Sequence, residues 1–414
     1  MEIKQESTCI YCKSNGPFTD EHVFPAGMGG DDSNYLLVDL VCGNCNTNIF
    51  SKLELSLMRR SPAAIGRKFL QSKTRDRGSK TSKPGIEARG QYILDESGEF
   101  LESESDKLGK EVVLAQLILK HPEFKYTAKD SELLGAFYMS LSSILGKSIV
   151  KLIHKIQAKQ FEVSSYQWNE DSYHLISRET MGAPPKDGIW LEAFNESNPA
   201  LSSRIFQRLG GQVALKVVPE GDQLAFLRSV RRALPSLENG ASKARPQTID
   251  KPIIHMQLAF DMQETERALA KIAVNFIAHT IGHEYVRHPA FDKVKRSILS
   301  GEPHLPVSFF GEEGKEAMLD VFGNPPQGCH CVMISGIPND DGGSDIYFAA
   351  KLYGSGAHRV VIAENAPPHQ YLHPIYFMID YEKYTISRLS MLEYQLKYGR
   401  LASQILGNPI HFKP

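Results

Sequence analysis

The sequence predicts an α+β protein, in which a small metal-stapled module at the N-terminus precedes a larger mixed region of helices and antiparallel sheet. Three observations predict this. Two closely spaced cysteine pairs lie near the N-terminus, apolar residues recur at three- and four-residue spacing in the middle of the chain, and runs of β-branched and aromatic residues lie near its end. A chain of 414 residues is also too long for one compact core, so two or three domains are expected.

The cysteine pairs predict a structural zinc site. Cys9 and Cys12 form one C-x-x-C knuckle, and Cys42 and Cys45 form a second. Each knuckle points two thiolates at one ion, and two knuckles complete a tetrahedral four-sulfur site. The segments "EHVFP", "YLLVDLV" and "CNTNIFSKLELSLMRR" suggest strand, strand and helix, in that order. Residues 1–60 therefore form a module with a thin core, to which zinc contributes much of the folding free energy.

Positive charge is concentrated directly after this module. Residues 59–89 hold ten Lys and Arg and two acidic residues, a net charge of +8, whereas the whole chain has −1. The segment is also rich in Ser, Thr, Gly and Pro, which is typical of a loop or linker. It is either a solvated linker or an arm that contacts nucleic-acid phosphates. The candidate contacts are Arg59, Arg60, Arg67, Lys68, Lys73, Arg75 and Arg77.

Three further regions follow the module. Residues 61–107 combine the basic linker with a hairpin that turns at 95–98, and residues 108–260 are predicted as a helical and mixed domain. Residues 261–414 are predicted as an α+β domain. Helices are expected over 108–121, 131–157, 264–282 and 290–301, and strands over 188–194, 211–219, 330–337, 345–354, 358–364 and 375–381.

The composition excludes several classes of protein. No apolar run approaches the ~20 residues that cross a bilayer, and the N-terminus lacks the plan of a signal peptide. We therefore expect a cytoplasmic protein without a membrane partner. Six cysteines are too few for a disulfide scaffold, and 42% hydrophobic and 23% charged residues are ordinary for a folded chain.

Glu21, His22 and Asn46 are the candidates for chemistry. Hydrolysis of a phosphodiester needs a base for water and a divalent ion for the phosphate and the leaving oxygen. An imidazole with an unperturbed pKa of about 6.5 suits the base. Glu21 would face away from His22 on a regular strand, so it reaches an ion only where the strand twists or ends. Asn46 would be fixed beside the last cysteine, where it is a candidate for the second ion ligand.

The segments "CIYC", "EHVFP…GG" and "VCGNCNTNIFSKLE" resemble the HNH endonucleases, a ββα-metal family, in their four-cysteine subtype. The resemblance covers about residues 9–60 and implies a treble-clef-like nuclease module with structural zinc. It also implies that His22 is the general base for DNA hydrolysis and that Glu21 and Asn46 hold a catalytic Mg²⁺ or Mn²⁺. RNA stays open as a substrate. The family's middle asparagine, which braces the histidine-bearing loop, is replaced by Leu37.

Three other groups of side chains are predicted to be structural and not metal sites: His279 with His283, Cys329 with Cys331, and His358 with His369 and His373. In the first group, the glutamate of "AHTIGHEY" follows the second histidine, which is not the order of an H-E-x-x-H zinc motif.

Three functions from different classes remain open: a metal-dependent DNA endonuclease, a zinc-dependent nucleic-acid-binding protein without catalysis, and a nuclease gated by a ligand. Most of the chain lies beyond the module, so we expect a sensing, recognition or oligomerising role there, for example in a bacterial antiviral defence effector. A small-molecule or protein activator and a homo-oligomeric state stay open.

Overall fold

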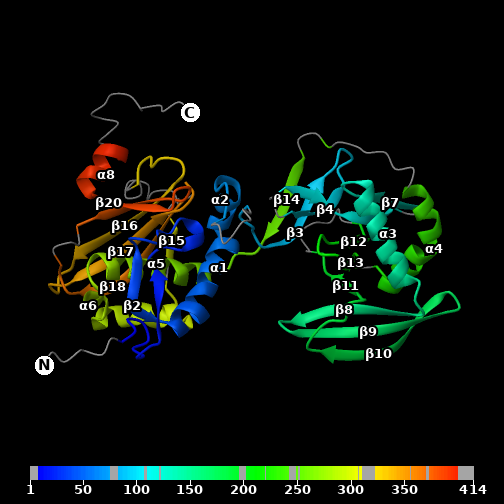
Figure 1. The fold of residues 1–414 in the computed structure, drawn as a ribbon, viewed down its shortest axis with the longest axis horizontal. Helices are drawn as coiled ribbons and strands as arrows, with labels where there is room; N and C mark the ends of the chain where they lie inside the picture. Colours follow the sequence, from blue (N-terminus) through cyan, green and yellow to red (C-terminus); the bar gives the residue numbers. More distant parts are fainter. Residues whose placement is uncertain are drawn as a thin grey trace. The chain divides into compact units, whose positions relative to one another are not determined.

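The computed structural model describes residues 8–74, 83–106, 110–120, 123–194, 202–219, 221–241, 249, 252–305, 307–309, 322–354, 356–369 and 373–399. These residues form a mixed α+β structure, as predicted, in two compact units (Figure 1). The first unit combines Met1–Glu87 with Ala259–Pro414, and the second is Ala88–Leu258. The predicted boundary after residue 60 therefore lies inside the first unit, whereas the one at residue 260 lies close to the observed change of unit.

The first unit contains the N-terminal hairpin, a six-stranded sheet and the helices around them. The sheet has the strand order β15-β18-β17-β16-β19-β20, and every neighbouring pair is antiparallel, as predicted for the last part of the chain. The elements are β1 (Phe18–His22), η1 (Ala26–Met28), β2 (Leu36–Cys42), η2 (Asn44–Phe50), α1 (Ser51–Arg59), α2 (Pro62–Leu70), α5 (Met262–Thr280), α6 (His283–Val286), η3 (Pro289–Phe291), α7 (Asp292–Ser300), β15 (Val307–Phe309), β16 (Cys329–Pro338), β17 (Ser344–Lys351), β18 (Ala357–Ala366), β19 (Ile375–Asp380), β20 (Thr385–Ser390) and α8 (Met391–Tyr398).

Helix α5 is the centre of the first unit. Its N-cap is Asp261, whose carboxylate accepts the backbone N–H of Glu264 at 3.0 Å, and it ends before Gly282, which has a φ of 128°. Almost every residue in the body of the helix is buried, because α5 contacts α1 and β2 as well as β17 and β18. One hydrophobic core therefore joins residues of the N-terminal module to those of the C-terminal sheet.

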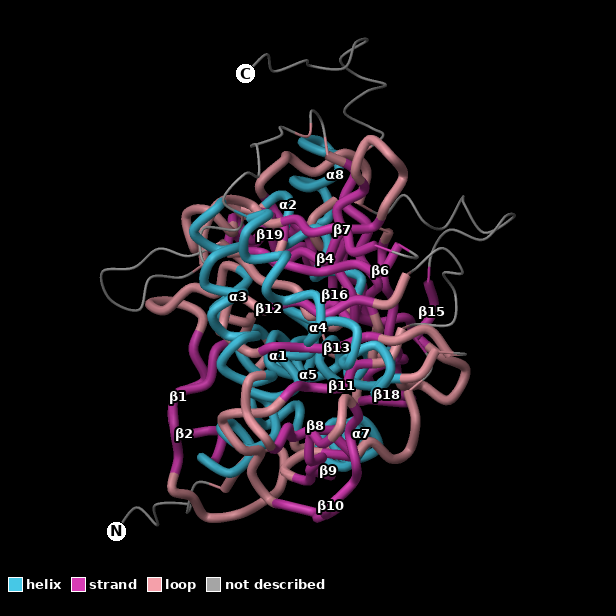
Figure 2. The backbone as a smooth tube through the Cα atoms, turned by 90° about the vertical axis from the view of Figure 1, so that its right-hand side faces the viewer, coloured by secondary structure: helices cyan, strands magenta, loops and turns pink. Residues whose placement is uncertain are grey.

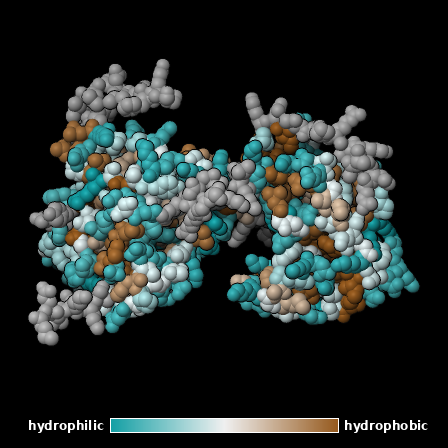
Figure 3. All heavy atoms as spheres, in the orientation of Figure 1, coloured by the Kyte–Doolittle hydropathy of each residue, from teal (hydrophilic) through white to brown (hydrophobic). Residues whose placement is uncertain are grey.

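Helix α8 closes a second, smaller core on the six-stranded sheet. A capping box between Ser390 and Glu393 begins the helix, and the ring of Tyr394 stacks on Tyr376 with 3.9 Å between the centroids. The thiol of Cys331 donates to the Tyr394 hydroxyl at 3.2 Å, so this cysteine has a structural role, as predicted. Three large apolar side chains of α8 are exposed (Figure 3), those of Met391, Leu392 and Leu396.

A buried histidine links the sheet to the N-terminal module. His330 of β16 is fully buried, its Nδ1 accepts the backbone N–H of Tyr353 at 3.1 Å, and its ring lies 5.5 Å from that of Phe24. Burial lowers the pKa of His330 to about 3, since the charged imidazolium would lose its water.

This shift predicts that stability falls in acid. Below the ordinary imidazole pKa of about 6.5 the unfolded chain binds a proton that the native chain does not, so the free energy of unfolding drops by up to about 1.4 kcal/mol per pH unit until the native group protonates. Urea denaturation of the wild type and the His330→Gln variant between about pH 4 and about pH 7 measures the effect. Equal pH slopes in the two proteins would contradict it, because any loss of zinc in acid affects both.

The second unit contains an eight-stranded and a four-stranded sheet. The larger sheet has the order β10-β9-β8-β11-β13-β12-β6-β7, and the smaller one β14-β3-β4-β5. Helices α3 and α4 share a hydrophobic core with the larger sheet, and β8, β9 and β10 run next to one another (Figures 1 and 2). The elements are β3 (Ala88–Leu94), β4 (Phe100–Ser105), β5 (Glu111–Val113), β6 (Ala115–Lys120), β7 (Glu123–Thr127), α3 (Ser131–Leu145), β8 (Ile149–Gln157), β9 (Gln160–Asn169), β10 (Ser172–Met181), β11 (Ile189–Glu192), β12 (Arg204–Gln207), β13 (Val213–Lys216), α4 (Gln223–Ala241) and β14 (Ile253–Leu258).

Two helix predictions in this unit are wrong. Residues 108–121 contain strands β5 and β6, and the predicted helix over 131–157 ends at Leu145 and is followed by strand β8. Both segments hold apolar and β-branched residues, and β6 lies inside the sheet with most of its side chains buried, so its pattern does not alternate as that of a half-exposed strand does. The turn predicted at residues 95–98 is confirmed, because the N–H of Gly98 donates to the Asp95 carbonyl at 3.0 Å.

Candidate functional site

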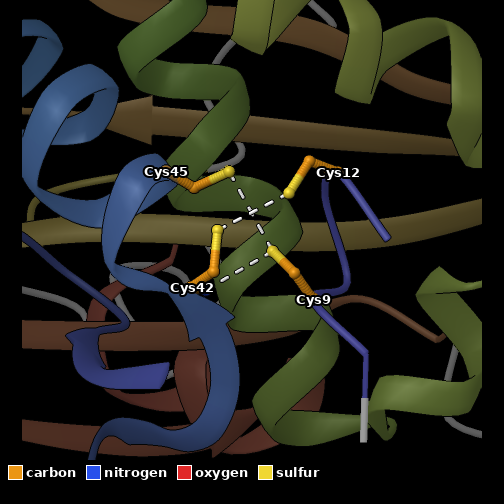
Figure 4. A group of neighbouring side chains, drawn as sticks. All are labelled: Cys9, Cys12, Cys42 and Cys45. Atoms are coloured by element: carbon orange, nitrogen blue, oxygen red, sulfur yellow. Dashed lines mark hydrogen bonds between the residues drawn. The ribbon is translucent and has the colours of Figure 1, made fainter. Parts of the chain in front are cut away.

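The four predicted zinc ligands lie together in the structure (Figure 4). Cys9 and Cys12 precede β1, Cys42 is the last residue of β2, and Cys45 lies in η2. Their sulfur atoms are all within 4.8 Å of one another; that of Cys9 is 4.0 Å from that of Cys45, and that of Cys12 is 3.5 Å from that of Cys42. A tetrahedral zinc with Zn–S bonds of about 2.3 Å would hold its sulfurs about 3.8 Å apart. The cluster therefore fits a zinc ion.

Two neighbours of the Cys9 sulfur favour its thiolate form. The contact between the Cys9 and Cys45 side chains is the main cause that lowers the pKa of Cys9 to about 4, and it raises the pKa of Cys45. The backbone N–H of Cys42 also donates to the Cys9 sulfur at 3.5 Å. Cys12 is exposed and the other three cysteines are buried. Four sulfur ligands leave no position for water or substrate, so the ion would be structural and would do no chemistry.

His22, the last residue of β1, is bonded to a carboxylate that the sequence did not reveal. Nε2 of His22 lies 2.6 Å from Oδ1 of Asp32, and the side chains are 30% and 48% exposed, respectively. A carboxylate only accepts hydrogen bonds, so Nε2 donates, and Nδ1 is the nitrogen that can accept a proton. The pair therefore sets the imidazole tautomer that a general base needs.

The loop between these two residues has a fixed path. It turns at Gly29, which has a φ of 105°, a conformation that favours glycine, and a Cβ there would lie 2.8 Å from the Cα of Tyr381. The carboxylate of Asp31 then accepts the backbone N–H groups of Ser33 at 2.8 Å and Asn34 at 3.0 Å. This turn holds the backbone on both sides of Asp32.

Asn46 lies in η2 and connects the start of this helix to β1. Its Nδ2 donates to the Thr19 hydroxyl at 3.1 Å and to the Asp20 carbonyl at 3.0 Å. Its side chain is partly exposed, and its amide oxygen is the atom that would bind a hard cation. The structure thus brings Asn46 to the strand that carries His22.

Glu21 lies on the other face of β1 and is buried, with 3% exposure. Its carboxylate forms an ion pair with Lys271 of α5 and accepts the Nδ2 of Asn275 at 2.9 Å. Lys271 is fully buried and also pairs with Glu54 of α1 at 2.6 Å. Burial raises the pKa of Glu21 although Lys271 opposes it, and the two carboxylates raise the pKa of Lys271 although burial opposes them.

This arrangement does not fit a divalent ion shared by Glu21 and Asn46. One oxygen of Glu21 already has an ammonium and an amide as partners. A divalent ion at Glu21 would also lie beside the positive charge of Lys271, which repels it. The role of Glu21 as an ion ligand stays a prediction, and it requires that the Lys271 pair opens.

The basic side chains predicted to contact phosphate differ in their exposure and in their partners. Arg67 is buried and its Nε donates to the Gly27 carbonyl at 3.2 Å, while Arg60 pairs with Glu264 at 3.0 Å and with Glu87 at 3.7 Å. These two guanidinium groups are therefore engaged within the chain. Arg59 and Lys73 are exposed, Lys68 is partly exposed, and Arg75 and Arg77 lie outside the described residues.

The histidines weighed as a second metal site make contacts within the chain. His279 stacks on Tyr35 with 4.7 Å between the ring centroids and donates to the Asn34 carbonyl at 2.8 Å, and His283 lies 3.0 Å from Glu284. Within the described ranges, the four cysteines are the only group of three or more His, Cys, Asp and Glu side chains whose ligand atoms lie close together.

Sequence reasoning missed Asp32, Lys271 and Asn275. A signal for the last two was present: in "ALAKIAVNFIA" they are the only polar residues of an otherwise apolar stretch, and their four-residue spacing places them on one face of a helix. Asp32 had no such signal, because it lies ten positions after His22, across a loop.

Comparison of the chain with models of known protein families gives no match, and comparisons with curated proteins and with solved structures give none either. The likeness to HNH endonucleases therefore depends on the motifs of residues 9–60. No helix in the described part of the chain has the length and apolar composition needed to cross a membrane.

Proposed function

We propose that this chain is a metal-dependent endonuclease of the HNH type that hydrolyses DNA phosphodiester bonds, with His22 as the general base. The main support for the proposal is the position of His22. The imidazole of His22, held by Asp32, lies on a strand of a strand–strand–helix module whose loops are joined by a four-cysteine cluster. A base held on a rigid frame is what attack of water on a phosphodiester requires.

In this proposal Nδ1 of His22 takes the proton of the attacking water, and Asp32 stabilises the imidazolium that forms. The carboxylate keeps the ring in one orientation, so the proton-accepting nitrogen stays directed at the water. A Mg²⁺ or Mn²⁺ would supply charge neutralisation at the phosphate and at the leaving 3′ oxygen. Asn46 is the residue that offers an amide oxygen for it, and Glu21 would take part only after release from Lys271.

The second candidate function is a zinc-dependent nucleic-acid-binding module without catalysis. The ion pair between Glu21 and Lys271 favours this candidate, since it occupies the carboxylate that the HNH likeness assigns to the ion. In that case His22 and Asn46 would only contact phosphate, and the exposed Arg59 and Lys73 would supply sequence-independent affinity.

The two functions differ in the effect of His22→Ala. For an endonuclease, wild-type protein with Mg²⁺ converts supercoiled plasmid to nicked and linear forms, and the variant is slower by about 10²- to 10⁴-fold. Asp32→Asn should give a smaller loss. Time courses on agarose gels measure the rates, and fluorescence anisotropy with a labelled duplex in Ca²⁺ measures affinity, which His22→Ala should leave nearly unchanged.

Two controls accompany this assay. His283→Ala removes a more exposed histidine outside the module and should cleave like the wild type. Single-stranded RNA and DNA of the same sequence distinguish the two nucleic acids as substrates. Binding without cleavage by wild-type protein, in Mg²⁺ and in Mn²⁺, would contradict the endonuclease and favour the binding module.

A further inference from the structure

Two polar side chains of α5 reach across the core to the strand that carries His22. Nδ2 of Asn275 donates to the backbone carbonyl of His22 at 3.0 Å and to Oε1 of Glu21 at 2.9 Å. Nζ of Lys271 lies 3.4 Å from the same His22 carbonyl. Asn275 thus contacts the backbone of the proposed general base directly, although 253 positions separate the two residues in the sequence.

The amide of Asn275 is itself held by the zinc knuckle. The hydroxyl of Tyr11 donates to Oδ1 of Asn275 at 2.6 Å, and also lies 3.3 Å from the carbonyl of Lys271. Because Oδ1 accepts from Tyr11, Nδ2 is the side of the amide that faces β1. Tyr11 lies between Cys9 and Cys12, so a continuous chain of bonds runs from the cysteine cluster through Asn275 to His22.

The charges around Lys271 explain why Glu21 belongs to this arrangement. The ammonium is fully buried and lies between the carboxylates of Glu21 and Glu54, which come from β1 and α1. A buried ammonium needs such partners, because unpaired it would lose its hydration without compensation. Glu21 thereby fixes β1 to α5 from the face opposite to His22.

We infer that Asn275, with Tyr11 and the Lys271–Glu21 pair, forms a brace that positions His22 for catalysis. The catalytic part of this inference rests on the proposed function. Helix α5 in this view adds to the support that β2 gives the His22 backbone, since His22 of β1 is paired with Leu36 of β2. Asn275 and Tyr11 are positioning residues, since neither touches the reacting atoms.

The inference is tested with Asn275→Leu in the full-length chain. Leucine has a similar volume but no amide, so the two bonds to β1 are lost. We expect kcat to fall by about 10- to 100-fold because the base is displaced, while KM changes less than about twofold. The zinc content should equal that of the wild type. Gln263→Ala is the matched control, because Gln263 also lies on α5 and donates to a backbone carbonyl, that of Gly301, outside the brace.

A second readout does not depend on cleavage. In protein labelled with ¹⁵N-histidine, the Nε2 proton of His22 reports its bond to Asp32 by NMR, and we expect this signal to shift or disappear in Asn275→Leu but to persist in Gln263→Ala. If the wild-type protein does not cleave DNA but the His22 signal still changes in Asn275→Leu, the proposed function is wrong, whereas the positioning of His22 by Asn275 is supported. A wild-type signal together with a wild-type kcat in Asn275→Leu would overturn the inference.

Tyr11→Phe covers the case in which Asn275→Leu does not fold. This change removes one hydroxyl and leaves both bonds from Asn275 to β1 in place, so the protein should fold with its zinc. We expect kcat to fall by roughly threefold to tenfold with KM unchanged, because the amide loses the bond that fixes its orientation. A lower melting temperature with unchanged kcat and unchanged His22 signal would show a merely structural role and would contradict the brace.

Discussion

Replacing Lys271 by methionine is expected to lower the free energy of unfolding of the first unit by about 3–5 kcal/mol. The ammonium is fully buried between Glu21 and Glu54, so its removal leaves a buried carboxylate without its positive partner. Glu21 has the larger effect, because its side chain is 4% exposed whereas that of Glu54 is 20% exposed and keeps some contact with water. Denaturation in urea, followed by hydrogen exchange of α1 and α5 peptides, measures the loss.

Two further variants assign the cause of this loss. Lys271→Met combined with Glu21→Gln removes both charges and should recover much of the stability, since a neutral amide costs less to bury than an unpaired carboxylate. Lys293→Met removes an exposed lysine that pairs with the exposed Glu364 at 3.2 Å, and should change stability by no more than about 0.5 kcal/mol. Equal losses of unfolding free energy in Lys271→Met and Lys293→Met would contradict the stabilising role of the buried ion pair.

The second large effect is expected from Cys45→Ser. The variant should bind no zinc, and the N-terminal module should lose its structure, because a structural zinc contributes roughly 10 kcal/mol or more whereas whole domains are stable by only about 5–15 kcal/mol. Hydrogen exchange should then rise in β1, β2 and α1, and also along α5, whose buried face packs against α1 and β2. Mass spectrometry of zinc content and of deuterium uptake measures both results.

The loss of structure should be confined to the first unit, and the loss of zinc should occur only when a ligand cysteine is replaced. The eight-stranded sheet has its own hydrophobic core with α3 and α4, so its exchange should stay as in the wild type. Cys329→Ser is the matched control, since Cys329 is a partly buried cysteine of β16 away from the cluster, and this variant should retain one zinc per chain. A Cys45→Ser protein with wild-type zinc content would disprove the assignment of this ligand.

Local spacing made the metal module predictable from the sequence. Two cysteines three positions apart in a C-x-x-C turn must approach each other, and the apolar segments between and after the two pairs indicate a short hairpin and then a helix. The structure has the hairpin β1–β2, followed by η2 and α1, and it joins all four sulfurs. The grouping of the four cysteines on a hairpin and a helix depends little on tertiary packing, which is why this part could be predicted.

The environment of Glu21 was not predictable in this way. Its partners Lys271 and Asn275 come from a helix more than 240 positions away, and no local pattern indicates which strand that helix meets. The same limit explains strand β6, where burial of most side chains inside a sheet removes the alternation that distinguishes a strand from a helix. Asp32 meets His22 only because of the path of an intervening loop, which sequence spacing does not give.

X-ray absorption at the zinc K-edge of the purified full-length protein tests the central claim most directly, because the position of His22 depends on the loops that the cluster joins. The account predicts one zinc per chain with four sulfur neighbours at about 2.3 Å and no nitrogen or oxygen ligand. Protein that contains no zinc, or a spectrum fitted by a mixture of sulfur with nitrogen or oxygen, would contradict it.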